Sequence, residues 1–416
     1  MNILVYEDSQ VEKLSPITTA RPAFCITCGC LRLVDFLNGL DGVTVVASVR
    51  KYLAAIVQID HEFLSSDLDR STELTVVVNA RCVPSQSNFS AICDMRGSKT
   101  KEPLYDELGN VAIAIVPTSD LLTNDDQSIG EKLIDIVGPK LPASKTVETF
   151  GLPHDVIKFN ELNFNENLEW LIRQKSISQT RDGVFLADDA QFSENVEVDT
   201  SNGAVVIDAG AKIKPFAYLR GPLYVGPNCT VNEHSSIKDY VCLTNTIKAG
   251  GEIEASVIEP YSNKQHHGFL GHSYLGSWIN LGAGTCNSDL KNTYGQVSAI
   301  YTNEKVATGM QFVGCFVGDY SKSAINTSIY TGKSIGVCSM LYGIVPTNVP
   351  SFTNYAKIFD QLTEIPAAVM LTTQKRMFGR RDVDQRPCDI QLMNDMFELT
   401  KNERELENVV QGQLNF

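Results

Sequence analysis

The sequence lacks the features that place a protein in a membrane or on nucleic acid. It has no run of about 18 or more apolar residues, the length needed to cross a bilayer. Basic residues are in deficit, because 35 Lys and Arg stand against 49 Asp and Glu, giving a formal net charge of -14. Nucleic-acid-binding proteins usually carry a basic patch, and anionic lipid repels an acidic surface. We therefore expect no nucleic-acid partner and no membrane partner.

Disulfide and secretion signals are also missing. The 11 cysteines are an odd number spread over 416 residues, which fits reduced thiols better than a secreted disulfide framework. Residues 1–8 do not show the basic segment and hydrophobic run of a signal peptide. We therefore predict a cytoplasmic protein. With 43% hydrophobic residues, and at about 150 residues per domain, the chain is expected to form two or three globular domains.

A six-residue repeat dominates the middle of the sequence. This period fits neither a helix nor an alternating strand, and it is typical of a hexapeptide β-solenoid, in which one side chain in six fills the interior. Three hexapeptides make one triangular coil, and coils stack at ~4.8 Å. A set of unrelated short strands with glycine turns is the alternative. The aliphatic positions, with Ser323 as the one miss, are Ile207, Ile213, Leu219, Val225, Val231, Ile237, Leu243, Ile247, Ile253, Leu275, Leu281, Val317, Ile329, Ile335 and Leu341.

The segments on either side of the repeat follow other patterns. Before it, buried-strand patterns alternate with helical patterns, which is typical of an α/β domain with a mostly parallel sheet. After Pro346 and Pro350, two helical patterns predict a structural tail with a solvated face around Arg404. The expected strands are 3–6, 75–78 and 111–116, and the expected helices are 30–40, 124–137, 165–174, 366–380 and 390–410.

Several motifs resemble a known enzyme family. Residues 263–271 (NKQHHGFLG), 274–276 (YLG) and 280–285 (NLGAGT) resemble the acetyltransferase half of the bifunctional glucosamine-1-phosphate acetyltransferase / N-acetylglucosamine-1-phosphate uridylyltransferase family, in particular its alternative bacterial branch. Residues 14–22 (LSPITTARP), the following Cys28-Gly29, 79–84 (NARCVP) and 287–295 (NSDLKNTYG) are similar to other parts of that branch. The resemblance runs over most of the chain.

The combined prediction is an α/β plus all-β protein. Residues 1–176 are expected to form a sugar-nucleotidyltransferase-like α/β domain and residues 177–350 a left-handed parallel β-helix of the acyltransferase type. Residues 351–416 are expected to form the helical tail. Solenoids of this kind usually trimerise with active sites shared between neighbours, so the resemblance also implies a homotrimer. Residues 286–310 interrupt the repeat and are predicted to leave the solenoid as a loop.

Acetyl transfer from a thioester to a sugar amine needs a base, an oxyanion donor and a phosphate holder. Histidine suits the first role because its ordinary pKa is ~6.5. By the resemblance, His266 is this base and Asn280 binds the sugar. Point charges on Lys264 and Lys291 are candidates for the phosphate. The other predicted residues are Asn287 for substrate, and Ala283, Gly284 and Thr285, whose backbone N–H groups would meet acetyl-CoA.

Other interpretations of these residues stay open. His266, His267 and His272 cluster, but no neighbouring cysteine or carboxylate has recognised ligand spacing, so we predict no metal site. Any one of the three histidines is also compatible with a hydrogen-bonded surface imidazole, and Asn280 alone with a turn. Two residues depart from the family pattern. Phe269 replaces a usual tyrosine, and Glu254 stands where a lysine is expected, so a carboxylate would oppose the substrate phosphate.

Nucleotidyl transfer needs a cradle for the triphosphate, a cation for the leaving pyrophosphate and usually Mg²⁺ on a carboxylate. In place of a glycine-rich loop, residues 15–22 offer hydroxyls and the phosphate-matching fork of an arginine, although a helix-capping loop is an equal alternative. The predicted nucleotide-binding residues are Ser15, Thr18, Thr19, Arg21, Asn79 and Arg81.

Two departures from the family pattern weaken the prediction of a nucleotide site. Thr27 stands where the family often has arginine, and Ala80-Arg81 stands where a metal-binding aspartate is usual, so the Mg²⁺ ligand is not evident. The cysteines at 25, 28 and 30 are interpreted as small buried thiols rather than zinc ligands, because a fourth ligand is missing.

The sequence thus predicts a transferase of sugar-nucleotide biosynthesis. Its substrates would be a sugar 1-phosphate, an acyl-CoA and a nucleoside triphosphate, and its product of the UDP-N-acetylglucosamine type. One alternative is a monofunctional acyltransferase or nucleotidyltransferase whose other site has lapsed. The second alternative is a non-catalytic scaffold that binds a sugar nucleotide.

Overall fold

The structure, a computed structural model, describes residues 1–97, 102–122, 127–142, 144–175 and 177–414. The chain packs as two compact units. The N-terminal unit comprises Met1–Leu14, Arg21–Ile26 and Leu31–Leu152, and the solenoid unit comprises Ser15–Ala20, Thr27–Cys30 and Pro153–Phe416. The long helix that was expected around residues 165–174 therefore packs with the solenoid.

A mixed six-stranded sheet forms the centre of the N-terminal unit. Strands β3, β2, β1 and β4 are mutually parallel, and β6 and β5 add antiparallel pairs at one side. The predicted strands at 3–6, 75–78 and 111–116 are confirmed as β1, β4 and β6, whose contiguous aliphatic residues are buried. In sheet order the strands are β3 (Leu64–Ser65), β2 (Thr44–Ser48), β1 (Asn2–Tyr6), β4 (Leu74–Asn79), β6 (Val111–Pro117) and β5 (Leu104–Tyr105).

Short helices connect these strands. The pattern at 30–40 gives a helix only from Leu33, and the pattern at 124–137 gives one only from Ile129, where Ser128 and Glu131 form a capping box. Residues 124–126 of that pattern lie outside the described residues. The α-helices of this unit are α1 (Leu33–Asn38), α2 (Ala54–Asp60), α3 (Gln86–Arg96), α4 (Thr118–Leu121) and α5 (Ile129–Val137), and its 3₁₀ helices are η1 (Ser9–Leu14), η2 (Ala23–Cys25) and η3 (Lys51–Leu53).

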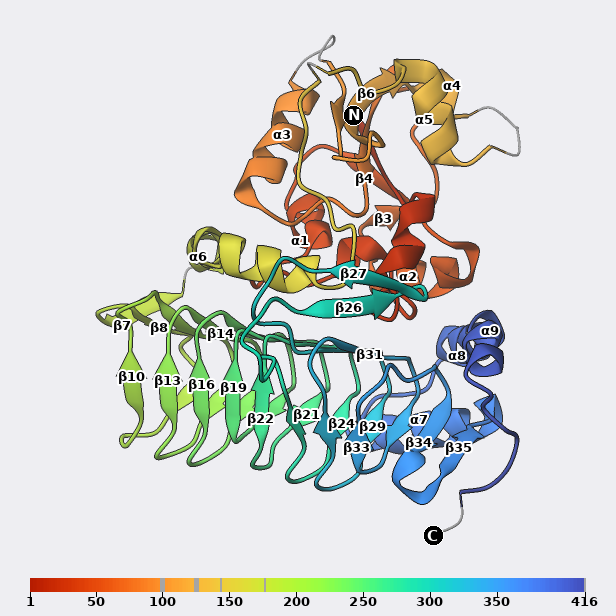
Figure 1. Ribbon diagram of the computed structural model, residues 1–416. Coiled ribbons are helices and arrows are strands. Elements are labelled where there is room, and N and C mark those ends of the chain that lie inside the picture. The colour runs from red at the N-terminus through yellow and green to blue at the C-terminus, as the bar shows by residue number, and fades with distance from the viewer. Residues whose placement is uncertain (98–101, 123–126, 143, 176, 415–416) are drawn as a thin grey trace. The chain divides into compact units, whose positions relative to one another are not determined.

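The second unit is a left-handed parallel β-helix, as predicted (Figure 1). Each coil adds one strand to each of three sheets. The first sheet contains β7 (Ser178–Arg181), β8 (Val184–Leu186), β11 (Val205–Ile207), β14 (Leu223–Val225), β17 (Val241–Leu243), β20 (Val257–Ile258), β23 (Tyr274–Leu275), β28 (Cys315–Val317) and β31 (Lys333–Ile335). The second contains β9 (Gln191–Phe192), β12 (Lys212–Ile213), β15 (Thr230–Val231), β18 (Lys248–Ala249), β21 (Asn263–Lys264), β24 (Asn280–Leu281), β29 (Lys322–Ser323), β32 (Met340–Leu341), β34 (Thr353–Ala356) and β35 (Gln361–Glu364).

The third face is built in two parts. Its strands are β10 (Glu197–Asp199), β13 (Tyr218–Arg220), β16 (Ser236–Lys238), β19 (Glu252–Glu254) and β22 (Phe269–Gly271), followed by β25 (Cys286–Asn287), β30 (Ser328–Ile329) and β33 (Ile344–Val345). Every aliphatic residue of the six-residue repeat is buried, none more than 3% exposed. Ser323, the one miss in the repeat, lies 2.7 Å from the hydroxyl of Thr285 through its own hydroxyl, inside the coil.

The predicted interruption after residue 286 is present and carries a hairpin. Between β25 and β28 the chain leaves the coil and forms the antiparallel pair β26 (Ser298–Tyr301) and β27 (Glu304–Ala307). The ladder nevertheless continues across the interruption, because Leu275 of β23 pairs directly with Val317 of β28.

Helices flank the solenoid within its own unit. They are α6 (Asp155–Lys175), α7 (Ala367–Gly379), α8 (Pro387–Leu399) and α9 (Lys401–Leu406), with η4 (Lys357–Phe359) in the tail. The pattern at 390–410 is thus two helices, divided at Thr400. In the predicted solvated face, Glu405 and Glu407 are exposed. Arg404 beside them is not, since it is 3% exposed and lies 2.8 Å from Glu364 Oε2. No helix in the described part of the chain is both long and apolar enough to cross a bilayer.

Candidate functional site

His266 lies at a corner of the solenoid, in the turn between β21 and β22. It opens into a groove of about 710 Å³ along this corner, which we call the histidine groove. Nε2 of His266 lies 3.1 Å from Nε2 of Gln265. The contact is within hydrogen-bonding distance, and the role of the imidazole nitrogen in it depends on the tautomer of the ring. Imidazole is a side chain suited to act as a general base at this position. The groove is lined by Lys212, Lys214, Thr230, Asn232, Glu233, His234, Lys248, Gly251, Gln265, His266 and His267.

Two glycines keep the corner under His266 tight. Gly251 has a φ of +72°, and a Cβ there would lie 2.8 Å from the carbonyl oxygen of His266. Gly268 has a φ of +128°, and a Cβ there would lie 2.2 Å from the carbonyl oxygen of Thr285. Both positions therefore require glycine, for backbone conformation and for space. This local constraint holds the backbone of His266 at the rim of the groove.

The groove concentrates positive charge in an acidic chain. Lys212, Lys214 and Lys248 line it, and its one carboxylate among the lining residues that the structure describes, Glu233, is 3.3 Å from Lys214 Nζ. Positive side chains in a cleft raise the local concentration of anionic ligands. The groove is therefore suited to a ligand that carries phosphate.

Lys264 lies inside the solenoid instead of facing the groove. It occupies an interior position of β21, is 2% exposed, and donates from Nζ to the carbonyl oxygens of Gly250 (3.0 Å) and His266 (2.7 Å). Both hydrogen bonds of its ammonium go to backbone carbonyls, and one of them holds the backbone of His266 from inside the solenoid. The phosphate contact predicted for Lys264 has to come from other cations.

The buried amine of Lys264 gives a testable dependence of stability on pH. Burial lowers the pKa of Lys264 to about 8, whereas in the unfolded chain it returns to ~10.4. Between these values the unfolded chain binds more protons, so this lysine destabilises the fold at neutral pH and the penalty is relieved as pH rises. The unfolding free energy of the wild type minus that of Lys264→Met should rise by about 2–3 kcal/mol from pH 7.5 to pH 10.

Guanidinium chloride unfolding at several pH values measures this difference. Lys291→Met removes a lysine on the excursion after β25 and controls for the loss of one positive charge. A Lys264 difference that stays constant over the pH range would show that its amine does not titrate in this window.

The other predicted substrate and cofactor residues fall in several places. Asn280, on β24, lies away from the histidine groove. Asn287 is 6% exposed and clamps the backbone of Gly271 through both atoms of its amide, at 2.9 and 3.0 Å. Lys291 is exposed and donates to the carbonyl oxygen of Gln296 at 3.1 Å. The structure thus gives Asn287 a backbone partner and does not bring Lys291 to the lining of the groove.

The turn predicted to meet the cofactor does reach the histidine corner. The N–H of Gly284 donates to the carbonyl oxygen of His267 at 3.1 Å, so Ala283 and Gly284 form the next corner of the stack. Thr285 is 2% exposed, and its hydroxyl is used by Ser323 inside the coil. The N–H of Thr285 donates to the carbonyl oxygen of Gly282 at 3.1 Å, so the N–H groups of Gly284 and Thr285 both have partners within the protein. Of the three residues, Ala283 stays the candidate for the predicted role.

The remaining histidine and the two departures lie outside the groove lining. His272 is held by Asp289 (Nδ1 to Oδ2, 2.8 Å) and stacks on Phe312, with ring centroids 5.1 Å apart. Glu254 is paired with Lys238 at 3.2 Å. Lys238 also pairs with Glu252 at 2.8 Å, so one cation is shared by two carboxylates of β19. Phe269 lies on β22.

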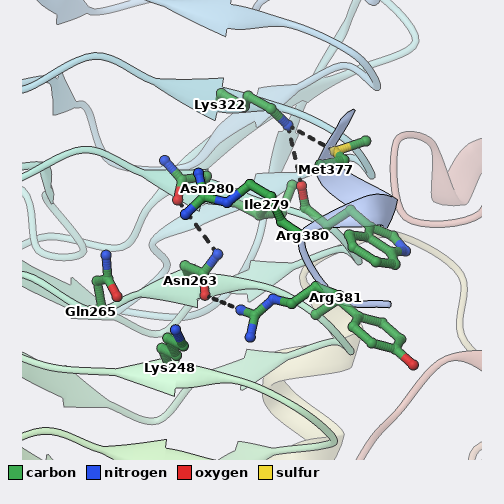
Figure 2. A pocket seen from close by; sticks show the side chains of 11 residues that line it. Lys248, Asn263, Gln265, Ile279, Asn280, Lys322, Met377, Arg380 and Arg381 are labelled. Carbon is green, nitrogen blue, oxygen red and sulfur yellow. Dashed lines mark hydrogen bonds between the residues drawn. The ribbon is translucent and has the colours of Figure 1, made fainter. Parts of the chain in front are cut away.

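A second cavity opens on the outer face of the second sheet, against the end of α7. We call this cavity, of about 310 Å³, the tail pocket (Figure 2). It shares Lys248 and Gln265 with the histidine groove. The sequence analysis did not find its cations, although a basic pair ending a helix in so acidic a chain was an available signal. It is lined by Lys248, Tyr261, Asn263, Gln265, Trp278, Ile279, Asn280, Lys322, Met377, Arg380 and Arg381.

In the N-terminal unit, Arg81 is buried in an ionic network. It is 0% exposed and donates to Asp8 (2.8 and 2.7 Å), to Asp106 (2.8 Å) and to the carbonyl oxygen of Phe150 (2.7 Å). Asn79, also 0% exposed, donates to Asp8 at 2.8 Å. The guanidinium has no free edge for a phosphate. The nucleotide-binding role predicted for Asn79 and Arg81 does not fit, and we assign both to the packing of this unit.

The same network contains the carboxylates that would be candidates for binding Mg²⁺. Asp8 and Asp106 are the acidic residues nearest the end of β4 in this network, and both carboxylates are already paired with the guanidinium of Arg81. They do not fit a Mg²⁺ site in this arrangement, and no group of three potential metal ligands occurs among the residues with described positions. We therefore derive no step through a metal.

The other predicted nucleotide ligands divide between the two units. Ser15, Thr18 and Thr19 belong to the solenoid unit, where the hydroxyls of Ser15 and Thr19 lie 3.3 Å apart and Thr18 is fully buried. Arg21 belongs to the N-terminal unit, where its carbonyl accepts from Arg50 at 3.0 Å. Their role stays a prediction.

The cysteines that raised the zinc alternative are buried. Cys25 packs in the N-terminal unit, with Sγ 3.2 Å from Nε2 of His61. Cys28 and Cys30 pack in the solenoid unit.

A parallel β-helix with an imidazole at a cationic corner, joined to an α/β unit, defines a hexapeptide-repeat transferase architecture. A family model described as "Sugar nucleotidyl transferase" matches residues 3–176. The chain belongs to the family of the acetyltransferase YaiX of Escherichia coli, and it is similar to bifunctional proteins named as nucleotidylyltransferases and acetyltransferases.

Three curated relatives illustrate this membership. A bifunctional sugar-1-phosphate nucleotidylyltransferase/acetyltransferase of Sulfurisphaera tokodaii is 30% identical over 161 residues, 37% of this chain and 40% of the relative. An uncharacterized acetyltransferase, YaiX, of Escherichia coli is 30% identical over 167 residues, 39% of this chain and 73% of the relative. The bifunctional protein GlmU of Wolbachia pipientis is 26% identical over 237 residues, 55% and 52% of the two chains. The chain spans about half the length of the bifunctional relatives.

Proposed function

We propose that the solenoid unit transfers an acetyl group from acetyl-CoA to the amine of an amino-sugar 1-phosphate. In the full chain this reaction would be joined to nucleotidyl transfer, giving a product of the UDP-N-acetylglucosamine type. The observation that carries the proposal is the imidazole of His266 in a groove that is also lined by three lysines. The names of the bifunctional relatives support the pairing of the two reactions.

The groove supplies the parts that the reaction requires. Lys212, Lys214 and Lys248 attract the phosphate of the acceptor and bring its amine to the corner. As the amine nitrogen bonds to the thioester carbonyl carbon, its proton passes to Nε2 of His266. Backbone N–H groups of the neighbouring corner stabilise the oxyanion. The carbon–sulfur bond then breaks, and His266 returns the proton to the leaving thiolate.

A homotrimer is part of the proposal. Sharing of the groove between neighbouring subunits would let a second chain complete the donor site beside His266. Light scattering coupled to size exclusion measures this state directly.

The Arg81 network favours a second candidate function, a monofunctional acyltransferase. The only guanidinium in this network is held by two carboxylates in the N-terminal unit, so the network offers no free positive charge to a nucleotide. In this alternative the N-terminal unit keeps the fold of a nucleotidyltransferase and lacks the reaction.

Two assays on the same preparation separate these functions. One supplies acetyl-CoA with glucosamine 1-phosphate, and the other supplies UTP with N-acetylglucosamine 1-phosphate. We expect acetylation in the first and pyrophosphate release in the second. Acetylation alone supports the monofunctional acyltransferase, and nucleotidyl transfer alone would contradict the role proposed for the histidine groove. Product in neither assay would leave the scaffold alternative.

A further inference from the structure

The tail pocket gathers positive charge from two elements. Lys248 and Lys322 come from strands of the second sheet, and Arg380 and Arg381 follow the end of α7 (Figure 2). None of the lining residues that the structure describes is a carboxylate. Four cations around about 310 Å³ in a chain of net charge -14 are a marked local excess.

The floor of the pocket is one outward-facing column of the second sheet. Lys248 pairs with Asn263, Asn263 with Asn280, and Asn280 with Lys322 on successive strands. The same column runs in the other direction through Thr230 to Lys212 of the histidine groove. A ligand lying along this column therefore passes from the tail pocket to the corner that carries His266.

An aromatic stack fixes α7 over this column. Trp278 lies between Tyr261, with ring centroids 4.3 Å apart and planes within 4°, and Phe378, at 4.4 Å. Phe378 is the penultimate residue of α7, so the stack anchors the end of the helix and places the two arginines beside the sheet. Arg381 also donates from Nη2 to Oδ1 of Asn263 at 2.7 Å, which orients its guanidinium over the column.

The positive charges of the pocket repel one another. Burial, and then the charges of Arg381 and Arg380, lower the pKa of Lys248. Burial, and then Arg380, likewise lower the pKa of Arg381. Nζ of Lys322 meets only neutral acceptors in the contacts seen: the carbonyls of Tyr320 (3.2 Å) and Trp278 (3.5 Å) and Sδ of Met377 (3.4 Å). An anion in the pocket would relieve this mutual repulsion.

We infer that the tail pocket binds the phosphate groups of a phosphate ester, held between Lys248 and the Arg380–Arg381 pair. Guanidinium forks match phosphate oxygens in pairs, and a lysine adds a point charge. The amides of Asn263, Asn280 and Gln265 are placed to hydrogen-bond the rest of the ligand. The identity of the ligand rests on the proposed function, which offers two sources of phosphate, the acyl donor and the sugar acceptor.

Calorimetric titration of the full chain, without turnover, tests this inference. The ligands are CoA, its phosphate-free fragment pantetheine, glucosamine 1-phosphate and glucosamine. Tighter binding of CoA than of pantetheine identifies the donor as the source, and tighter binding of the sugar phosphate than of the free sugar identifies the acceptor. The replacement of both arginines, Arg380→Gln with Arg381→Gln, should weaken the phosphate-bearing ligand at least ~10-fold. High salt should weaken wild-type binding as well.

Lys375→Gln with Arg376→Gln removes the same charge from exposed positions of α7 that do not line the pocket, and this variant should bind as the wild type does. If circular dichroism shows that the arginine variant is unfolded, Lys248→Gln on the sheet carries the same test. Unchanged affinity in the folded variant, or no preference for either phosphate, would overturn the inference. Phosphate-dependent binding without any acetylated product would contradict the proposed reaction and leave the inference standing.

Discussion

Replacing His266 with alanine is expected to lower the rate of acetyl transfer at least ~10²-fold, because it removes the imidazole that is proposed to take the amine proton. The assay is the release of CoA thiol with acetyl-CoA and glucosamine 1-phosphate at saturating concentrations of both. The loss should appear in kcat with little change in KM, since His266 acts on the proton and the lysines of the groove hold the phosphate. Nucleotidyl transfer, measured on the same preparation, should be unaffected.

His272→Ala provides the matched control for His266. His272 is close to His266 in the sequence but follows β22. It is held by Asp289 and stacked on Phe312, outside the residues that line the groove. Its replacement should leave acetylation within a few-fold of wild type. Full activity of the His266 variant would remove the imidazole from the mechanism, and an equal loss in both variants would point to damage of the coil.

Arg81→Met should destabilise the N-terminal unit by about 3–5 kcal/mol, because it leaves the buried carboxylates of Asp8 and Asp106 without their counter-ion. Burial alone would raise the pKa of Asp8, but the hydrogen bonds and the charge of Arg81 outweigh burial and hold this pKa below its ordinary value. Asp8 therefore stabilises the fold above its unfolded pKa, and this contribution is lost as pH falls through its lower, folded pKa. Guanidinium chloride unfolding at pH 7 and in acid measures both effects.

Two further variants serve as a control and a rescue for Arg81→Met. Arg70→Met removes an exposed arginine from the same unit and should cost less than about 1 kcal/mol. Adding Asp8→Asn and Asp106→Asn to Arg81→Met should recover much of the lost stability, since it removes the uncompensated charges. A loss below about 1 kcal/mol in Arg81→Met itself would mean that water reaches the network, and the buried assignment would fail.

The repeat made the solenoid predictable from the sequence, because a residue every six positions must point to the axis of a coil. The same period does not tell which chemistry an interior position tolerates. Lys264 occupies such a position, and its ammonium is satisfied by the carbonyl oxygens of Gly250 and His266. From the sequence it appears beside a histidine in a polar segment, which favoured a phosphate contact. The direction of its side chain depends on the register between β18 and β21.

Contacts between distant segments account for the other differences. Arg81 meets Asp8 and Asp106 only because β1 lies beside β4 and the chain returns through β6, a topology that no local motif specifies. The tail pocket escaped prediction for the same reason, since the end of α7 meets β18 only in the folded unit. His266 could be predicted because its motif is local and its corner is part of the repeat.

The pairing of Leu275 with Val317 across the excursion has a consequence for how this fold can change. The strand ladder closes as if the intervening segment were absent, so a corner of the coil can lengthen or shorten at little more than the entropy of closing a loop. Insertions and deletions at such corners can therefore change the residues around a binding site while the paired strands of the β-helix keep their register.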